Sequence, residues 1–392
     1  MGADGRKIAG VGRYGFPAGG RPGAWHCFGN EGGQVIPAMT SDGRMWRWVC
    51  GVADRARVLK VPPPGLVTCG ESPLSERDCL DPRCLDEPSR LYPAPRPIRP
   101  DVWETIDEAD GVEVEALAFP SAAPFGLSPN DRVSVRFYRP AQGPPLVNLL
   151  VLHGIWRQDQ EFEDKLCREL ARQRVSCALL SLPFHWDRAP EGAPSGAYFL
   201  SGNPLWTSAA FRQAIIDSRG ILGLLRGRGV PVGVLGFSLG GIIAHMLMAI
   251  EPLDFGASTF AGGNTAGIVW ESVLTRSYRR AMEAADITLD RLTRLWATGN
   301  PTSFAHRARP ARLLMINARY DLCVPLRFTL ELWRALGEPT IRWLPSGHIT
   351  GFLYRETIVA EVLAALGLPR PLEVPCRLRL RLSPVRQMRW AA

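Results

Sequence analysis

The stretch Gly236-Phe237-Ser238-Leu239-Gly240-Gly241 separates two apolar runs of different length. The run before it, 230–235, is short and rich in valine, whereas the run after it, 242–250, is long enough for a buried helix. The pattern predicts a strand, a sharp turn and a helix, with Ser238 at the tip of the turn. Residues two positions either side of such a serine must be small, because larger side chains would collide across the turn. Gly236 and Gly240 meet that need.

Other strand and helix patterns alternate on both sides of this turn. Because a glycine-rich chain can contain a G-x-S-x-G pattern by chance, this alternation is needed as support. It predicts an α/β fold with a mostly parallel central sheet flanked by helices. Two leading antiparallel strands are expected at 111–119 and 131–139, then strands at 146–152, 176–182, 230–235, 257–261, 313–316 and 340–344, and helices at 159–174, 208–226, 242–250, 326–336 and 353–366.

The chain divides into three parts by composition. Residues 1–100 are rich in Gly, Pro and Arg and are expected to be mostly irregular or disordered, with a short ordered piece within 39–61. Whether this extension is a natural part of the protein stays open. Residues 101–368 form the predicted α/β domain, in which a helical insertion at about 265–308 is expected to act as a cap. Residues 369–392 are a basic tail, with an edge strand as the alternative.

The charge of the chain is concentrated at its two ends. The 46 Lys and Arg against 38 Asp and Glu give a formal net charge of +8, yet residues 101–369 hold 26 cationic and 27 anionic side chains. A nearly neutral body argues against a nucleic-acid groove. The sequence shows no secretory signal and no membrane-spanning run, so we expect a cytoplasmic protein whose basic tail offers at most weak attraction to a membrane.

The nine cysteines give little sign of a metal centre. Cys79 and Cys84, with Cys69 nearby, have a poor spacing for zinc and lack a paired C-x2-C motif. Free thiols in a reducing compartment are the preferred interpretation. We therefore predict no metal and no cofactor.

Three residues that together can perform nucleophilic catalysis follow predicted strands in the order Ser238, Asp321, His348. That order, with His153-Gly154 after a buried strand and Gly347-His348 after the last one, resembles the α/β-hydrolase superfamily on its esterase and lipase side, over about 110–367. The loop Leu182 to His185 and the stretch 262–280 also resemble a little-characterised abhydrolase-domain family.

The resemblance and the proton chemistry together give each residue a role. Ser238 would be the nucleophile, His348 the general base, and Asp321 the group that orients the imidazole and stabilises its charged form. The backbone N–H groups of Leu239 and Ile155 would form the oxyanion hole, with Gly154 allowing the close approach of the turn.

Several of these residues have simpler interpretations. Asp321 would then only cap the helix that follows it, and His348 would be an ordinary loop histidine. A structural role is preferred for His153, which would hold the oxyanion turn, and for His245, which would pack within its helix. The residues expected to contact substrate are His185, Arg188, Asn264 and Trp270, with Trp296 also in the cap.

The sequence thus predicts a serine hydrolase that cleaves a carboxylic ester or thioester of a small molecule through an acyl-enzyme. A serine nucleophile argues against dehalogenase and epoxide hydrolase chemistry, for which the resemblance implies aspartate. Acyl transfer and perhydrolysis use the same triad and stay open. The alternative from another class is a non-catalytic binding module on the same fold.

Overall fold

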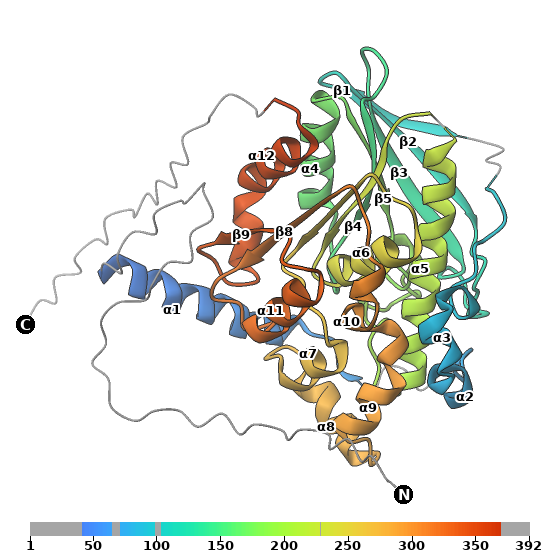
Figure 1. Cartoon of the computed structure of the whole chain (residues 1–392), viewed down its shortest axis with the longest axis vertical. Coiled ribbons are helices and arrows are strands. Elements are labelled where there is room, and N and C mark those ends of the chain that lie inside the picture. Colours follow the sequence, from blue (N-terminus) through green and yellow to red (C-terminus); the bar gives the residue numbers. More distant parts are fainter. Residues whose placement is uncertain (1–40, 65–70, 99–102, 228, 370–392) are drawn as a thin grey trace, which may run out of the picture.

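A computed structural model describes residues 41–64, 71–98, 103–227 and 229–369 of the 392-residue chain. The first 40 residues, and the predicted basic tail from residue 370 on, lie outside the described residues. The described residues contain one mixed sheet with helices against both faces (Figure 1).

The sheet has the strand order β1-β2-β3-β5-β4-β6-β7-β8-β9. Strands β1 to β3 are antiparallel to their neighbours, and the six strands from β5 to β9 across the sheet run parallel. Every residue of β4, β5, β6 and β7 is buried, as expected for strands covered on both faces. The strands are β1 (Glu104–Ala109), β2 (Val112–Pro120), β3 (Arg132–Pro140), β4 (Val147–Leu152), β5 (Val175–Leu180), β6 (Val232–Phe237), β7 (Phe255–Thr259), β8 (Arg312–Ala318) and β9 (Thr340–Leu344).

Two large apolar clusters hold the helices to the sheet. Helices α4 (Glu161–Arg172) and α12 (Arg355–Leu366) pack on one face, while α5 (Pro204–Arg226) and α6 (Leu239–Ile250) pack on the other (Figure 1). Helix α11 (Leu326–Ala335) adds a smaller cluster against β8 through Leu332 and Met315. Most crossovers between parallel strands pass through a helix, which places the carboxyl ends of these strands together at one edge of the sheet.

The insertion between β7 and β8 is helical, as expected from its sequence. It comprises α7 (Thr265–Glu271), α8 (Arg276–Ala284), α9 (Leu289–Leu295) and α10 (Pro301–Phe304). Figure 1 shows α7, α8 and α9 grouped beyond one end of the sheet, on the side where α1 also lies.

The part of residues 1–100 that the structure describes, 41–64 and 71–98, is more regular than expected and has a helix in the stretch 39–61 where an ordered piece is predicted; the rest of this expectation lies outside the described residues. The described part contains helices α1 (Ser41–Ala56), α2 (Glu76–Leu80) and α3 (Arg83–Asp86), and Tyr92 belongs to the main apolar cluster. Strand β1 was not predicted either. Its six residues are all exposed, so it carries no alternation of buried and exposed positions that sequence reasoning can detect.

Candidate active site

The turn around Ser238 has the strained geometry that its glycines suggest. Ser238 adopts φ 53° and ψ −113° between β6 and α6, an unusual conformation for a residue with a side chain. A Cβ atom on Gly236 would lie 2.1 Å from the carbonyl oxygen of Gly240, and one on Gly240 would lie 2.2 Å from that of Leu152. Only glycine fits either position, so the turn can form only with this sequence pattern.

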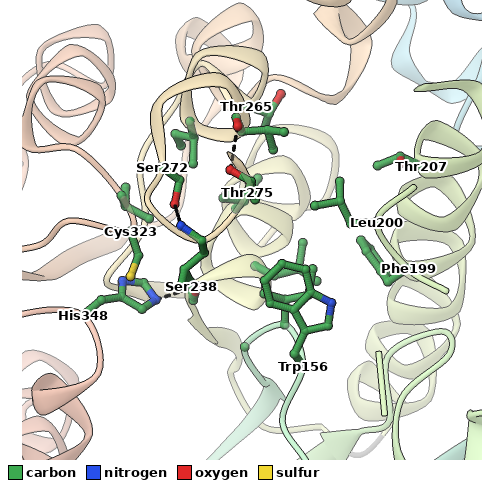
Figure 2. A pocket seen from close by; sticks show the side chains of 18 of the residues that line it. Trp156, Phe199, Leu200, Thr207, Ser238, Thr265, Ser272, Thr275, Cys323 and His348 are labelled. Atoms are coloured by element: carbon green, nitrogen blue, oxygen red, sulfur yellow. Dashed lines mark hydrogen bonds between the residues drawn. The ribbon is translucent and has the colours of Figure 1, made fainter. Parts of the chain in front are cut away.

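A chain of two hydrogen bonds links Ser238 to the predicted base and acid. The Oγ of Ser238 lies 3.0 Å from Nε2 of His348 (Figure 2), and Nδ1 of His348 lies 2.7 Å from Oδ2 of Asp321. The other carboxylate oxygen of Asp321 accepts the backbone N–H groups of Cys323 and Val324. Asp321 therefore holds the turn that follows it and also orients the histidine; it does not cap the next helix, α11 (Leu326–Ala335), whose N-cap position is Pro325.

The surroundings of His348 stabilise its charged form. Burial by itself lowers the pKa of the imidazole, but the carboxylate of Asp321 and, further away, that of Asp54 outweigh this effect. The pKa of His348 is therefore raised above its usual value of 6.5. A base with this property holds the proton it takes from a serine more readily than a free imidazole does.

The loop after β4 is fixed by backbone contacts next to Ser238. Nε2 of His153 accepts the N–H of Leu182, and the carbonyl oxygen of His153 accepts the N–H of Gly240. Within the described chain we find no acceptor for the N–H groups of Ile155 and Leu239, and both residues line the same cavity as Ser238. The two N–H groups are thus available for a ligand.

Helix α1 reaches the same loops from the N-terminal part of the chain. Asp54 is fully buried, and its carboxylate accepts the N–H groups of Leu322 at 3.0 Å, His348 at 3.1 Å and Ile349 at 2.9 Å. One side chain therefore ties the loop of Asp321 to the loop of His348. Sequence reasoning missed it, because no local motif marks an aspartate whose partners lie 268 to 295 positions away.

Two further side chains from this region contact the site loops. The indole N–H of Trp46 donates to the carbonyl of Pro345 at 2.6 Å, just before the loop of His348. Nη2 of Arg57 donates to the carbonyl of Trp156 at 2.6 Å, beside Ile155. Helix α1 and the 3-10 helix η1 (Arg57–Lys60) after it therefore contact all three loops that surround Ser238.

Ser238 and His348 open into a cavity of about 460 Å³. Its walls come from α1, α5, α6, α7 and the loops after β4 and β8, and Figure 2 shows Trp156, Phe199 and Leu200 across the space from Ser238. Apolar and aromatic side chains dominate: Leu91, Tyr92, Ile155, Trp156, Phe199, Leu200, Phe211, Leu239, Ile242, Ile268, Val269, Leu274, Trp296, Val324, Ile349 and Phe352.

The four residues expected to contact substrate do not line this cavity. His185 is fully buried, and its Nε2 accepts the N–H of Trp156. Arg188 is fully buried and pairs with Asp217 at 2.9 Å. The expectation failed because these side chains hold the loop together from within instead of facing solvent.

The two residues expected from the insertion also have structural contacts. Asn264 caps α7 by accepting the N–H of Gly267 at 3.0 Å, and the ring of Trp270 lies under Arg279 at 5.2 Å. Trp296, in contrast, does line the cavity. His245 packs within α6, with its Nε2 2.8 Å from the hydroxyl of Ser258.

Asp321, Cys323 and His348 have donor atoms close enough to one another to hold a metal ion. The chemistry of this set is unfavourable. Burial raises the pKa of the Cys323 thiol well above its usual value, whereas a metal ligand must be a thiolate. Nδ1 of His348 and Oδ2 of Asp321 already form a hydrogen bond with each other, so their arrangement suits proton transfer better than metal binding.

The comparisons with solved structures show that the chain has the α/β-hydrolase fold. An acetyl xylan esterase from Paenibacillus sp. R4 aligns with a TM-score of 0.57 and 15% identity over 80% of this chain and 99% of that one. Acetyl xylan esterase 1 from Thermoanaerobacterium sp. JW/SL YS485 aligns with a TM-score of 0.55 and 17% identity over 71% and 93%. The predicted fold class is thereby confirmed.

Sequence relatives are distant and add no activity. No protein-family model matches the chain. An uncharacterised protein of Mycobacterium tuberculosis is 28% identical over 197 residues, which are 50% of this chain and 46% of the relative. The uncharacterised protein YdjC of Bacillus subtilis is 22% identical over 107 residues, 27% of this chain and 92% of the relative. The chain thus spans about half the length of the first relatives it matches.

Among the described residues, no helix is both long and apolar enough to cross a membrane.

Proposed function

We propose that the protein is a serine hydrolase that cleaves carboxylic esters or thioesters through an acyl-enzyme. The observation that carries this proposal is the hydrogen-bond chain from Ser238 through His348 to Asp321, placed at the wall of a large apolar cavity. A nucleophile needs a base within hydrogen-bond reach and a group that orients that base. Ser238, His348 and Asp321 would fill these three roles.

The reaction follows from these positions. Oγ of Ser238 attacks the carbonyl carbon of the ester while Nε2 of His348 takes the serine proton. The negative charge that forms on the carbonyl oxygen is bound by the N–H groups of Leu239 and Ile155. The same proton then passes from His348 to the leaving alkoxide or thiolate, which departs as the ester bond breaks.

The second half of the reaction releases the acid. Water attacks the acyl group on Ser238, His348 takes a proton from that water, and the proton returns to Oγ of Ser238 when the acyl bond breaks. Asp321 keeps the imidazole in the tautomer that presents Nε2 to Ser238. Asp54 acts as a positioning residue, because it holds the backbone of the His348 loop without touching the reacting atoms.

A panel of p-nitrophenyl esters, from acetate to decanoate, tests the proposal. We expect hydrolysis by the wild-type protein with a preference for chains longer than acetate, because the cavity lining is mainly apolar. The Ser238→Ala variant should lose the activity, and Ser277→Ala, an exposed serine on α8, should keep it. Equal rates with Ser238→Ala and wild type would reject the proposed nucleophile.

A further inference from the structure

The charged residues that line the cavity are all cationic. Arg57, Lys60 and Arg157 contribute to its walls, and no Asp or Glu is among the described residues that do so. A cavity of one charge sign inside low-dielectric walls attracts ligands of the opposite sign. Which of these cations can bind an anionic ligand depends on which of them already has a carboxylate partner within the protein.

Arg157 is already neutralised within the protein. Its guanidinium makes two hydrogen bonds to the carboxylate of Glu163, at 3.1 and 3.2 Å, and Glu163 is fully buried. Its charge is thus compensated, and Arg157 is not the candidate for binding a ligand.

Arg57 differs, because no carboxylate partner is found for it in the described part of the chain. Its one recorded hydrogen bond goes to the carbonyl of Trp156, which leaves most of its five N–H donors for other acceptors. Burial, and next the neighbouring charge of Arg157, lower the pKa of Arg57. The charge of Asp159, which is paired with Arg157, offsets only part of this effect. A partly buried cation with no carboxylate in contact costs stability, which an anionic ligand would offset.

Lys60 lies one helical turn further along η1 and is exposed. Its ammonium group also has no carboxylate within 4.0 Å among the described residues. The two cations thus come from one short element, with Arg57 beside the oxyanion turn and Lys60 nearer solvent. The rest of the lining is mainly apolar, with hydroxyl groups such as that of Thr265.

We propose that Arg57 and Lys60 form an anion-binding subsite, so that the preferred substrate is an ester whose apolar chain also carries a carboxylate or phosphate group. That the ligand is a substrate rests on the proposed hydrolase function, but the binding of an anionic amphiphile can be measured without turnover. The apolar chain would lie against the aromatic and aliphatic walls, and the anion would face the guanidinium of Arg57.

Calorimetric titration with octanoate, octyl phosphate and neutral octanamide tests the subsite. We expect wild-type protein to bind the two anions at least about tenfold more tightly than the amide, as a charge-assisted hydrogen bond supplies. Arg57→Gln should remove most of this difference, and Arg57→Lys should restore part of it. Arg55→Gln is the matched control, because Arg55 lies on α1 but does not line the cavity.

The anionic arms also distinguish the two forms of the ligand, since either carboxylate or phosphate binding more tightly identifies the preferred group. Equal affinity for octanoate and octanamide, or an equal effect of Arg55→Gln and Arg57→Gln, would overturn the subsite.

Hydrolysis of p-nitrophenyl hexanoate and of mono-p-nitrophenyl adipate provides the second readout. A preference for the charged ester that Arg57→Gln and Lys60→Gln reduce supports the subsite. Arg57-dependent anion binding without any ester hydrolysis would reject the hydrolase function alone, and hydrolysis without charge preference would reject the subsite alone.

Discussion

Replacing Asp54 with asparagine removes the negative charge of this side chain and one of the two oxygens that accept backbone N–H groups from the loops of Asp321 and His348. Oδ2 of Asp54 accepts the N–H groups of Leu322 and His348, and Oδ1 accepts that of Ile349. Asparagine has the same shape but only one acceptor oxygen. With that oxygen in the Oδ2 position, the amide group of Asn would face the N–H of Ile349, and this bond would be lost.

The size of the effect follows from the lost bond. A hydrogen bond to a charged acceptor contributes about 2 kcal/mol. If the productive position of the loop loses this much stabilisation, kcat/KM falls by a factor of about 30. Asp54→Ala leaves three N–H groups without their acceptor, one of them buried and two partly buried, and should cost more. Stability should also fall in both variants, so activity alone does not separate a positioning role from a folding role.

The pH profile separates the two roles. His348 must be neutral to accept the serine proton, so kcat/KM rises with pH through the pKa of His348. The charge of Asp54 helps to raise that pKa, and removing the charge lowers it. In Asp54→Asn the acidic limb of the profile should therefore move to lower pH while the maximum falls. A purely structural role would lower the maximum without moving the limb.

The assay is kcat/KM for a p-nitrophenyl ester between pH 5 and 9, with thermal unfolding to confirm that each variant is folded. Arg55→Gln on the same helix is the control and should leave the acidic limb in place. If folded Asp54→Asn keeps the wild-type maximum and the wild-type limb, helix α1 does not position the base, and the role assigned to Asp54 is wrong.

Two pairs of substitutions test the turn and the loop by stability. Gly236→Ala should destabilise the protein by more than about 3 kcal/mol in urea unfolding, because its Cβ would lie 2.1 Å from the carbonyl oxygen of Gly240. Gly154→Ala should be tolerated, since the nearest atom lies at 3.5 Å; the close approach expected at Gly154 therefore does not require glycine. Equal stability of the two variants would contradict the geometry of the turn. Arg188→Met should cost about 3–5 kcal/mol because Asp217 keeps its buried position without a cation. A second change, Asp217→Asn, should recover part of that loss, and no recovery would show that the charge is not the cause.

The features that sequence reasoning could predict are those with local patterns. Ser238 stands between a short valine-rich run and a long apolar one, and the two glycines around it have no substitute in the observed turn. Asp321 and His348 each follow a strand, so the topology of a parallel sheet places them near Ser238. The distances of 3.0 and 2.7 Å agree with that expectation.

The features that the sequence could not show depend on distant partners. Asp54 and Arg57 lie in a region rich in Gly and Pro, and their contacts with the loops around Ser238 are set by how α1 packs on the finished domain. A loop rich in Gly, Pro and aromatic residues, such as 183–204, is also ambiguous, because Arg188 looks the same in sequence whether it faces substrate or a buried Asp217. Only the fold decides between a side chain that binds a ligand and one that holds its own loop.

The most direct test of the central claim is intact-mass measurement after treatment with a fluorophosphonate probe. Such probes phosphonylate a serine that a neighbouring base has activated. We expect one adduct on the wild-type protein, located at Ser238, which is absent in Ser238→Ala and strongly slowed in His348→Asn. An unmodified wild-type protein, or an adduct that persists in Ser238→Ala, would contradict the assignment of Ser238 as the nucleophile.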